Sequence, residues 1–428
     1  MKVCVFGLWH LGCVTAACLA NAGHDVTGLD LDEELIGALR QGRAPLYEPG
    51  LDDALKAGIA SGRLHFETNR AAAVAGADIV WVTFDTPVDD NDIPQVAAVY
   101  DSVLALAQDL PHNCLVLVSS QLPVGTTRQL ATAANADGRH VTFAYSPENL
   151  RLGEAIRVFC RPDRVIVGLM SDADRAKIAE LLAPFTNNII WMNLEAAELT
   201  KHAINAFLAT SVVFMNEIAS LCERTGANAK DVEIGLKSEQ RIGPKAYLSP
   251  GGAYAGGTLA RDITTLIDIG HTQGLPMPLV FAVRESNDRH RAWGLQKLAE
   301  RLGDLRGKRI AILGLTYKPG TSTLRRSSAV ELARALIAHG AQVSAYDPEV
   351  KKLPADLSGQ IDLFEEAALV AQNADAIVVA TLWPEFRALD WSALIASMGA
   401  PIVVDPNWFL AEVLKDRPGV TYLAVGGS

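Results

Sequence analysis

The stretch that decides the fold is Lys2-Val-Cys-Val-Phe-Gly-Leu-Trp-His-Leu-Gly12, together with Asp25-Val-Thr-Gly-Leu-Asp30 shortly after it. Lys2 to Phe6 is a short apolar run of the kind that forms a buried parallel strand. A glycine turn and a helix through about Ala22 follow, and the second run ends in an acidic residue. Strand, glycine turn, helix, strand and acid form a βαβ unit, so we predict a Rossmann-like dinucleotide-binding domain.

The glycine turn also predicts the cofactor and its contacts. We expect Gly7, Trp9, Leu11 and Gly12 to surround the pyrophosphate at the start of the helix. Asp30 lies at the right distance along the chain to accept hydrogen bonds from a ribose diol, which favours NAD over NADP. The middle position of the G-x-G-x-x-G fingerprint is Trp9, so its indole must swing aside if it is not to crowd the phosphates.

Three further strands are expected over 78–84, 114–119 and 141–145. Each ends in a polar or proline-bearing loop, and ligands bind at the carboxyl ends of the strands in a doubly wound sheet. We therefore expect these loops to rim one cleft, with Thr86 and Gln121 near the cofactor. The alternative is that each loop is a plain connection. The loops are Asp85-Thr-Pro87, Ser120-Gln-Leu-Pro-Val-Gly-Thr126 and Ser146-Pro-Glu148.

A long helical pattern runs from Glu195 to about Thr225 without an internal proline or glycine. Lys201 and Asn205 are four residues apart and therefore share one face, with Glu198 one turn earlier. These polar side chains on a mostly apolar helix are candidates to line a site. A solvated stripe explains them about equally well.

Residues 307–349 repeat the design of the N-terminus. Three pairs of segments match, namely 309–314 with 3–7, 339–347 with 22–30, and 374–379 with 77–82. We predict an α/β protein with two Rossmann-like doubly wound domains joined by a long central helix and a small helical domain. The expected domain boundaries are 1–194, 195–298 and 299–428.

The second half lacks a phosphate fingerprint, and Gly314-Leu-Thr-Tyr-Lys-Pro-Gly320 stands in its place. Lys318 and Arg325 make this region basic, which suits a nucleotide or pyrophosphate other than the redox cofactor. The alternative is that these two side chains only solubilise the surface.

A glycine-rich stretch in the middle of the chain, Gly251-Gly-Ala-Tyr-Ala-Gly-Gly257, allows close approach of the backbone to a ligand or turns with positive φ. The hydroxyl of Thr258 follows it, and the charged pair Arg261-Asp262 opens a helical run over 263–270. This combination is typical of an active-site loop. An ordinary glycine-rich turn is the alternative.

The composition narrows the classes of partner and compartment. A net charge of −11 and a pI of about 5.3 argue against a nucleic-acid surface or an anionic membrane face. The six cysteines are scattered without a C-x-x-C pair, which indicates free thiols in a reducing cytoplasm. We expect no metal site, no signal peptide and no apolar run long enough to span a membrane.

The order and spacing of many short motifs resemble the UDP-glucose/GDP-mannose dehydrogenase family from the first strand nearly to the end. Those before the central helix are Ala22-Gly-His-Asp-Val-Thr-Gly-Leu-Asp30, Leu46-Tyr-Glu-Pro-Gly-Leu51, Pro123-Val-Gly-Thr126, Ser146-Pro-Glu148 and Pro162-Asp-Arg-Val-Ile-Val-Gly168. Those after its start are Lys201-His-Ala-Ile-Asn-Ala-Phe-Leu-Ala209, Arg241-Ile-Gly243, Leu313-Gly-Leu-Thr-Tyr-Lys-Pro319, Tyr346-Asp-Pro348 and Trp383-Pro-Glu-Phe386.

This resemblance implies an NAD-binding N-terminal domain, a central helix that forms a homodimer, and a C-terminal domain for the nucleotide of an NDP-sugar, with UDP favoured. Such enzymes oxidise the sugar C6 alcohol to a carboxylate in two hydride transfers while a cysteine holds the aldehyde. By the same resemblance Lys201 and Asn205 match the oxyanion pair, and Glu148 and Asp262 match the family's catalytic carboxylates. The positions that match substrate contacts are Arg241 (reaching in from the partner subunit), Tyr247, Leu248, Gly251, Gly256, Lys318 and Arg325.

Several departures from the family pattern cluster on the chemistry. Thr258 stands where the family has its cysteine, and Arg261 stands where it has a lysine. A threonine hydroxyl is far less acidic than a thiol, so a thiohemiacetal is not available. The other departures are Trp9, Asp85, Gln121 and Leu152.

Four functions follow as alternatives. The first is an NAD-dependent nucleotide-sugar oxidoreductase with a single or altered oxidation. The second is an epimerase-type enzyme that retains NAD, and the third is an NDP-sugar-binding protein without catalysis. A conventional two-step UDP-glucose 6-dehydrogenase is the fourth, and it is what the resemblance alone suggests.

Overall fold

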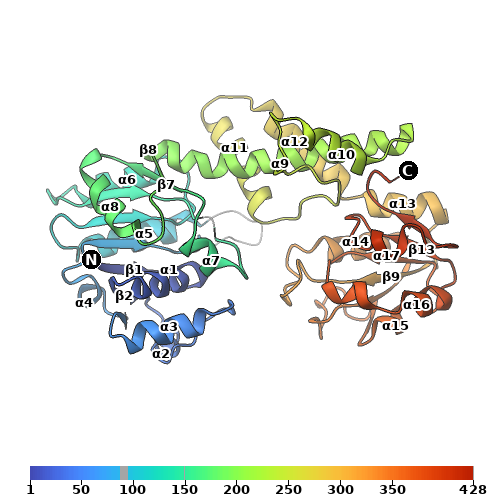
Figure 1. Cartoon of the computed structure of the whole chain (residues 1–428), viewed down its shortest axis with the longest axis horizontal. Helices are drawn as coiled ribbons and strands as arrows, with labels where there is room; N and C mark the ends of the chain where they lie inside the picture. Colours follow the sequence, from blue (N-terminus) through green and yellow to red (C-terminus); the bar gives the residue numbers. More distant parts are fainter. Residues whose placement is uncertain (87–94, 149, 428) are drawn as a thin grey trace. The chain divides into compact units, whose positions relative to one another are not determined.

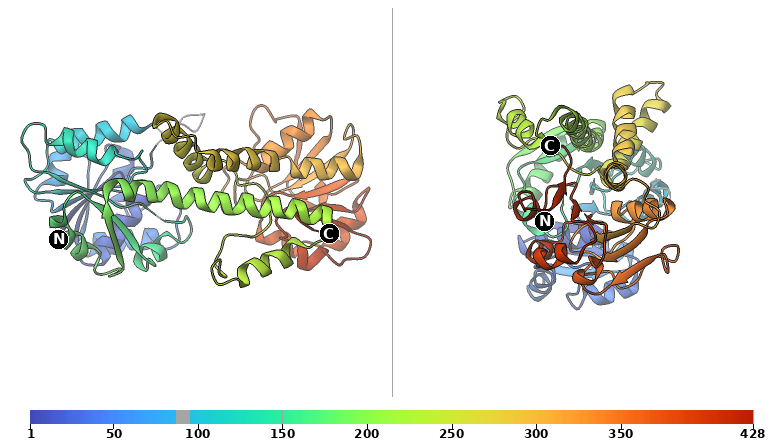
Figure 2. Two further views of the ribbon diagram at one scale, coloured as in Figure 1. Left: turned by 90° about the horizontal axis from the view of Figure 1, so that it is seen from above. Right: turned by 90° about the vertical axis from the view of Figure 1, so that its right-hand side faces the viewer.

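The computed structural model describes residues 1–86, 95–148 and 150–427 (Figure 1). The chain forms two compact units, Met1–Ala203 and Ile204–Ser428. Their boundary falls within the central helix α9 (Leu194–Thr225), which is continuous from end to end (Figure 2). The predicted helix from Glu195 to Thr225 is therefore confirmed.

The first unit is built on an eight-stranded sheet with the strand order β3-β2-β1-β4-β5-β6-β7-β8. All neighbouring strands are parallel except β6 and β7. The central strands are almost fully buried apolar runs, as expected where helices cover both faces. The strands are β1 (Lys2–Phe6), β2 (Asp25–Leu29), β3 (Leu64–Glu67), β4 (Ile79–Val82), β5 (Leu115–Val118), β6 (Thr142–Tyr145), β7 (Val165–Leu169) and β8 (Ile189–Asn193).

Helix α1 (His10–Asn21) is the most buried helix segment of this unit, with every residue from Leu11 to Ala20 buried. Small side chains such as Ala16 and Ala17 let it pack closely on the sheet, and it also packs against α3 and α7. The other helices are α2 (Glu33–Leu39), α3 (Leu51–Ala60), α4 (Arg70–Val74), α5 (Val96–Ala107), α6 (Thr126–Ala134), α7 (Ala155–Cys160), η1 (Asp172–Asp174) and α8 (Arg175–Leu182).

The second unit contains a six-stranded parallel sheet with the order β11-β10-β9-β12-β13-β14. Its first four positions repeat the order β3-β2-β1-β4, and the Gly314 N–H donates to Tyr346 O as the Gly7 N–H donates to Leu29 O. The predicted internal repeat of two Rossmann-like halves is thus confirmed. The strands are β9 (Arg309–Leu313), β10 (Gln342–Tyr346), β11 (Ile361–Phe364), β12 (Ala376–Val379), β13 (Ile402–Val404) and β14 (Thr421–Leu423), and the helices are α14 (Ser328–Ala338), α15 (Ala367–Val370), η2 (Pro384–Ala388), α16 (Trp391–Ser397) and α17 (Ala411–Leu414).

A helical layer completes the second unit. Ala206, Val213 and other apolar side chains of α9 pack against Ile263 of α11 (Thr258–Thr272) and Val283 of α12 (Pro278–His290). By length and composition α9 could cross a membrane, but it carries Glu198, which is buried and hydrogen-bonded within the protein. The remaining helices of the layer are α10 (Ala229–Ser238), α11 (Thr258–Thr272), α12 (Pro278–His290) and α13 (Trp293–Leu302).

Candidate active site

The turn between β1 and α1 requires glycine at two positions. Gly7 has a φ of 96°, which L side chains rarely adopt. A Cβ added to Gly12 would lie 1.9 Å from the Gly7 carbonyl oxygen, so no side chain fits there. The Thr83 hydroxyl donates to that same carbonyl oxygen at 2.8 Å and holds the turn from β4. The backbone is therefore shaped for close contact with a ligand.

The N-terminus of α1 has donors to offer such a ligand. Trp9 is the N-cap residue and its side chain makes no capping bond. Within the described residues, no acceptor satisfies the backbone N–H groups of Trp9, His10, Leu11 and Gly12. Orphan donors at a helix N-terminus form a ready anion site, so the turn fits a pyrophosphate. Trp9 has a φ of −82°, which does not require glycine, and its side chain is 48% exposed.

Asp30 and its counterpart Asp347 show which Rossmann half is open to a ribose. Asp30 accepts from the Leu8 N–H at 2.8 Å and from the Asp32 N–H at 3.2 Å, and remains partly exposed. Asp347 is only 1% exposed, and its Oδ2 accepts from Leu315 N, Thr316 N and the Trp383 indole N–H. Only the first half therefore has an acid that solvent or a ribose diol can reach.

The two Rossmann halves also differ at the start of the first helix. In the second half Ser327 caps α14 by accepting from the Ala329 and Val330 N–H groups. Two N–H groups at the start of α14 are thus satisfied by a side chain, whereas, in the described part of the chain, the four at the start of α1 are not. The start of α14 therefore offers fewer open donors to an anion than the start of α1.

Lys201 meets the Ser146-Pro-Glu148 loop inside the first unit. Its Nζ donates to the Glu148 carbonyl oxygen at 2.6 Å and lies 3.9 Å from Glu148 Oε1. The Glu148 carboxylate also accepts from the Leu150 N–H at 2.7 Å. A hydrogen bond of 2.6 Å from the Thr86 hydroxyl to Gln121 O joins two further loops of the expected rim. Pro87, the last residue of the expected Asp85-Thr-Pro87 loop, lies outside the described residues.

Glu198, one turn before Lys201, is fully buried and was not predicted to have a specific role. Its carboxylate accepts from the Gly125 N–H (2.6 Å), the Thr127 N–H (2.9 Å) and the Thr127 hydroxyl (2.6 Å). Burial raises the pKa of Glu198, and these bonds only partly oppose that rise. Glu198 therefore caps α6. It also attaches the loop that contains Gln121 to helix α9.

Glu48 is a second buried carboxylate that joins distant segments, here next to the turn between β1 and α1. It is buried and accepts from the Gly153 N–H at 2.7 Å and the Ala155 N–H at 2.8 Å, while its Oε2 lies 2.9 Å from His10 Nε2. Burial alone would raise the pKa of Glu48, but these hydrogen bonds outweigh it and lower the pKa. Glu48 thereby ties the start of α1 to the start of α7.

In the second unit the glycine-rich stretch 251–257 is held by amide side chains from distant segments. Asn216 of α9 accepts from the Gly251 N–H, and Asn407 accepts from the Gly252 N–H at 3.0 Å. The side chain of Asn287 in α12 accepts from the Tyr254 N–H at 2.9 Å and donates to the Tyr254 carbonyl oxygen at 3.0 Å. These bonds define one conformation for a stretch that could otherwise adopt many.

Helix α11 begins at Thr258, three residues before the charged pair Arg261-Asp262 that was expected to open the helical run. Gly257 precedes it with a φ of 109°, so the glycine ends the loop and the helix starts at once. Thr258 and Asp262 are consequently one helical turn apart on the same face. The fully buried Asp262 accepts a short hydrogen bond from Asn205 Nδ2, which connects α11 to α9. Thr258 itself is exposed.

Comparison with known proteins matches all three parts of the chain. Residues 1–186 match the NAD binding domain of the UDP-glucose/GDP-mannose dehydrogenase family, residues 195–289 its central domain, and residues 311–412 its UDP binding domain. The chain belongs to this family. It is an NAD-dependent nucleotide-sugar dehydrogenase by family, and NAD is the cofactor of the first Rossmann half.

Relatives of the dehydrogenase align over the full length. The chain is 37% identical to the UDP-glucose 6-dehydrogenase of Rhizobium meliloti strain 1021, over 100% of this chain and 99% of that protein. It is 33% identical to the Pseudomonas aeruginosa enzyme of the same name, over 100% and 97%. Among solved structures, a UDP-glucose dehydrogenase from Pyrobaculum islandicum has a TM-score of 0.88 and 31% identity, over 100% and 98%.

The predicted substrate contacts Gly251 and Gly256 belong to the glycine-rich stretch of the dehydrogenase. A Cβ on Gly256 would lie 3.3 Å from the Arg326 side chain, so the loop that carries Lys318 and Arg325 passes close by. Leu248 is buried and Tyr247 is exposed. The Arg241 side chain is 87% exposed and pairs with Glu239 at 3.0 Å.

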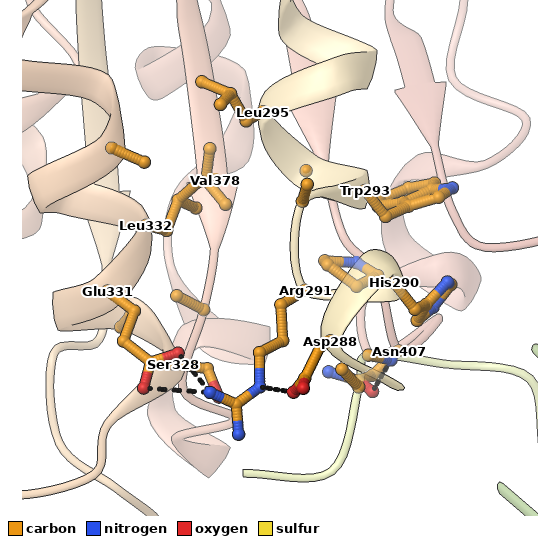
Figure 3. Close-up of a pocket in the computed structure, with 18 residues that line it drawn as sticks. Asp288, His290, Arg291, Trp293, Leu295, Ser328, Glu331, Leu332, Val378 and Asn407 are labelled. Atoms are coloured by element: carbon orange, nitrogen blue, oxygen red, sulfur yellow. Dashed lines mark hydrogen bonds and ion pairs between the residues drawn. The ribbon is translucent and has the colours of Figure 1, made fainter. Parts of the chain in front are cut away.

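A cavity of about 370 Å³ lies beside the glycine-rich stretch and was not predicted (Figure 3). Gly252 and Asn407 form part of its wall, and Leu332 and Val378 give it an apolar interior. Arg291, which also lines the cavity, lies 3.7 Å from Asp288 and 3.3 Å from Glu331. The cavity arises where α12, α13, α14 and the end of β12 meet, which no local sequence pattern reveals.

One of the six cysteines of the sequence lies in the second unit, which also holds the glycine-rich stretch. Cys222, the cysteine of the second unit, is buried in a core cluster with Met215 and Trp293. A sulfur atom in that apolar core is not available to an aldehyde. The prediction that Thr258 stands at the position of the family's cysteine stays a prediction, and the structure places Thr258 at the first residue of α11.

Proposed function

We propose that this dehydrogenase oxidises an alcohol of a nucleotide sugar, preferably a UDP-sugar, to the aldehyde and does not complete the second oxidation efficiently. The observation that carries the proposal is Thr258 at the start of α11, one turn from the buried Asp262. A thiolate at that position would add to the aldehyde and prepare it for a second hydride transfer. A threonine hydroxyl is too weakly acidic to do so without a dedicated base.

The first Rossmann half would hold NAD through the groups described above. The open N–H groups at Trp9–Gly12 suit the pyrophosphate, and Asp30 suits the ribose diol. Gly7 and Gly12 permit the close approach, and Thr86 and Gln121 are assigned to the nicotinamide side of the site. Bound NAD supplies the acceptor for the hydride.

The oxyanion that forms as the alcohol loses its proton is assigned to Lys201 and Asn205, on one face of α9. Asp262 uses one N–H of the Asn205 amide and so orients the group, which leaves the second N–H to donate to substrate. Lys201 has three donors, of which one is used by Glu148 O. The overall change is R–CH2OH plus NAD⁺ to R–CHO, NADH and one proton, so the reaction balances without a co-reactant.

We further propose that the enzyme is a cytoplasmic homodimer formed along α9. Phe207, Phe214 and Leu221 are exposed at seven-residue spacing on this helix, a pattern that a second copy would cover. The exposed Arg241 would then reach the substrate of the partner subunit. Residues Tyr247, Leu248, Gly251, Gly256, Lys318 and Arg325 are assigned to the sugar nucleotide, within the domain division 1–194, 195–298 and 299–428.

The test is a screen of NDP-sugars with NAD, followed by absorbance of NADH and mass spectrometry of the product. We expect an aldehyde-level product from the wild-type enzyme and a gain of uronic acid in Thr258→Cys. Thr258→Ser is the matched control and is expected to behave like wild type. Copurified NAD with no net NADH would instead indicate an epimerase, and sugar-nucleotide binding without NAD binding would indicate a binding protein.

A further inference from the structure

Two cysteines far apart in the sequence meet in the first unit. Cys18 lies on α1, Cys160 is the last residue of α7, and their sulfur atoms are 3.7 Å apart. Cys18 is buried, whereas Cys160 is only partly buried and so can meet a small reagent from solvent. Formation of a disulfide requires the sulfurs to approach from this distance to about 2.0 Å.

We propose that Cys18 and Cys160 form a redox-sensitive thiol pair, which peroxide converts to a disulfide that joins α7 to α1. The pair rests in the dithiol state, as expected in a reducing cytoplasm. The proposal concerns the first unit alone and does not depend on which reaction the enzyme catalyses.

The chemistry of the two thiols is complementary. The hydrogen bond between the two thiols, together with the charge of Arg161, lowers the pKa of Cys160 to about 7, although burial opposes this. The same hydrogen bond and burial raise the pKa of Cys18. Cys160 is therefore the thiolate that reacts first, and Cys18 is the thiol that resolves the product.

The reaction proceeds in two steps. The Cys160 thiolate attacks one oxygen of hydrogen peroxide, the O–O bond breaks, and hydroxide leaves to give a sulfenic acid at Cys160. The Cys18 sulfur then attacks the Cys160 sulfur, the S–O bond breaks, and water leaves as the disulfide forms. Two thiols and one peroxide give one disulfide and two waters, so the atoms and electrons balance.

The disulfide would restrain a segment that is already held at its other end. The Ala155 N–H at the start of α7 donates to Glu48, which also contacts His10 at the start of α1. A bond between Cys160 and Cys18 would add a second connection at the end of α7. We expect slower hydrogen–deuterium exchange over 155–160 and a higher melting temperature after oxidation, because the cross-link also restricts the unfolded chain.

The experiment treats the full chain with hydrogen peroxide and then counts free thiols after denaturation, with peptide mapping by mass spectrometry. We expect four free thiols instead of the six cysteines of the sequence, a Cys18–Cys160 peptide pair, and reversal by dithiothreitol. Cys18→Ala and Cys18→Ser are both expected to lose the cross-link and to accumulate over-oxidised Cys160. Cys114→Ser, which removes a buried thiol elsewhere in the unit, should form the cross-link normally.

Three results would overturn the proposal. One is retention of all free thiols under peroxide, and another is a cross-link that joins other cysteines or two chains. The third is equal thiol loss in wild type and in the Cys18 variants. If a Cys18 variant does not fold, peptide mapping of wild type alone still decides between these outcomes and the expected one.

Discussion

Replacing Glu198 by alanine is expected to destabilise the first unit by ~3–5 kcal/mol. The carboxylate accepts three hydrogen bonds in a fully buried position, two of them from the backbone at the start of α6. Each buried donor left without a partner costs ~1–3 kcal/mol, and the Thr127 hydroxyl can recover part of this by rotating to another acceptor. The expected total is therefore below the simple sum of three.

For a unit of the size of Met1–Ala203, each kcal/mol shifts the melting temperature by about 2–4 °C, so Glu198→Ala should lower it by roughly 6–20 °C. Circular dichroism and urea unfolding measure this directly. Glu198→Gln is the matched control, because its one carbonyl oxygen can keep part of the bonding, and a loss of about 1–2 kcal/mol is expected. A loss below about 1 kcal/mol in Glu198→Ala would refute the assigned role of the carboxylate.

A comparison of wild type with Glu198→Gln tests the sign of the pKa shift at Glu198. Because burial raises the pKa of Glu198 in the folded state, the folded protein binds this proton more tightly than the unfolded chain. Wild type should therefore lose stability relative to Glu198→Gln as pH rises from 4.5, the ordinary pKa of a glutamate, through the raised pKa of the folded state. A difference that is independent of pH over that window would contradict the assignment.

Three further predictions concern the binding turn and the oxyanion pair. Glu48→Gln should be less stable than wild type at neutral pH, and the difference should shrink as pH falls below 4.5 through the lowered folded pKa. Gly12→Ala should abolish NAD binding in calorimetry, since a Cβ there would lie 1.9 Å from Gly7 O, and undiminished affinity would contradict this. Asp262→Asn should lower kcat roughly 10²-fold with an intact fold, through loss of orientation at Asn205, and an unchanged kcat would exclude that role.

Much of the scaffold is predictable because it depends on local patterns. The strand Lys2–Phe6, the glycine turn and the matching run at Arg309–Leu313 are each readable from apolar periodicity and glycine placement. The same two signals show in the sequence that the strand β9 and its following glycine repeat the pattern of β1. The family resemblance then adds the expected order of the site residues.

What is not predictable rests on contacts between distant residues. Nothing around Asp347 in sequence indicates that the indole of Trp383 fills its hydrogen-bonding capacity. The bond from Gly252 to Asn407 spans 155 residues, and that from Gly125 to Glu198 spans 73. The early start of α11 at Thr258 was missed because the expected start was assigned to the charged pair that follows.

The most direct test of a single oxidation is the ratio of NADH formed to sugar nucleotide consumed, with the product identified in the same reaction. The presence of Thr258 in place of a thiol predicts one NADH per sugar nucleotide and an aldehyde-level product. Steady release of a uronic acid with two NADH per sugar nucleotide would contradict the account and would assign the conventional two-step reaction to this enzyme.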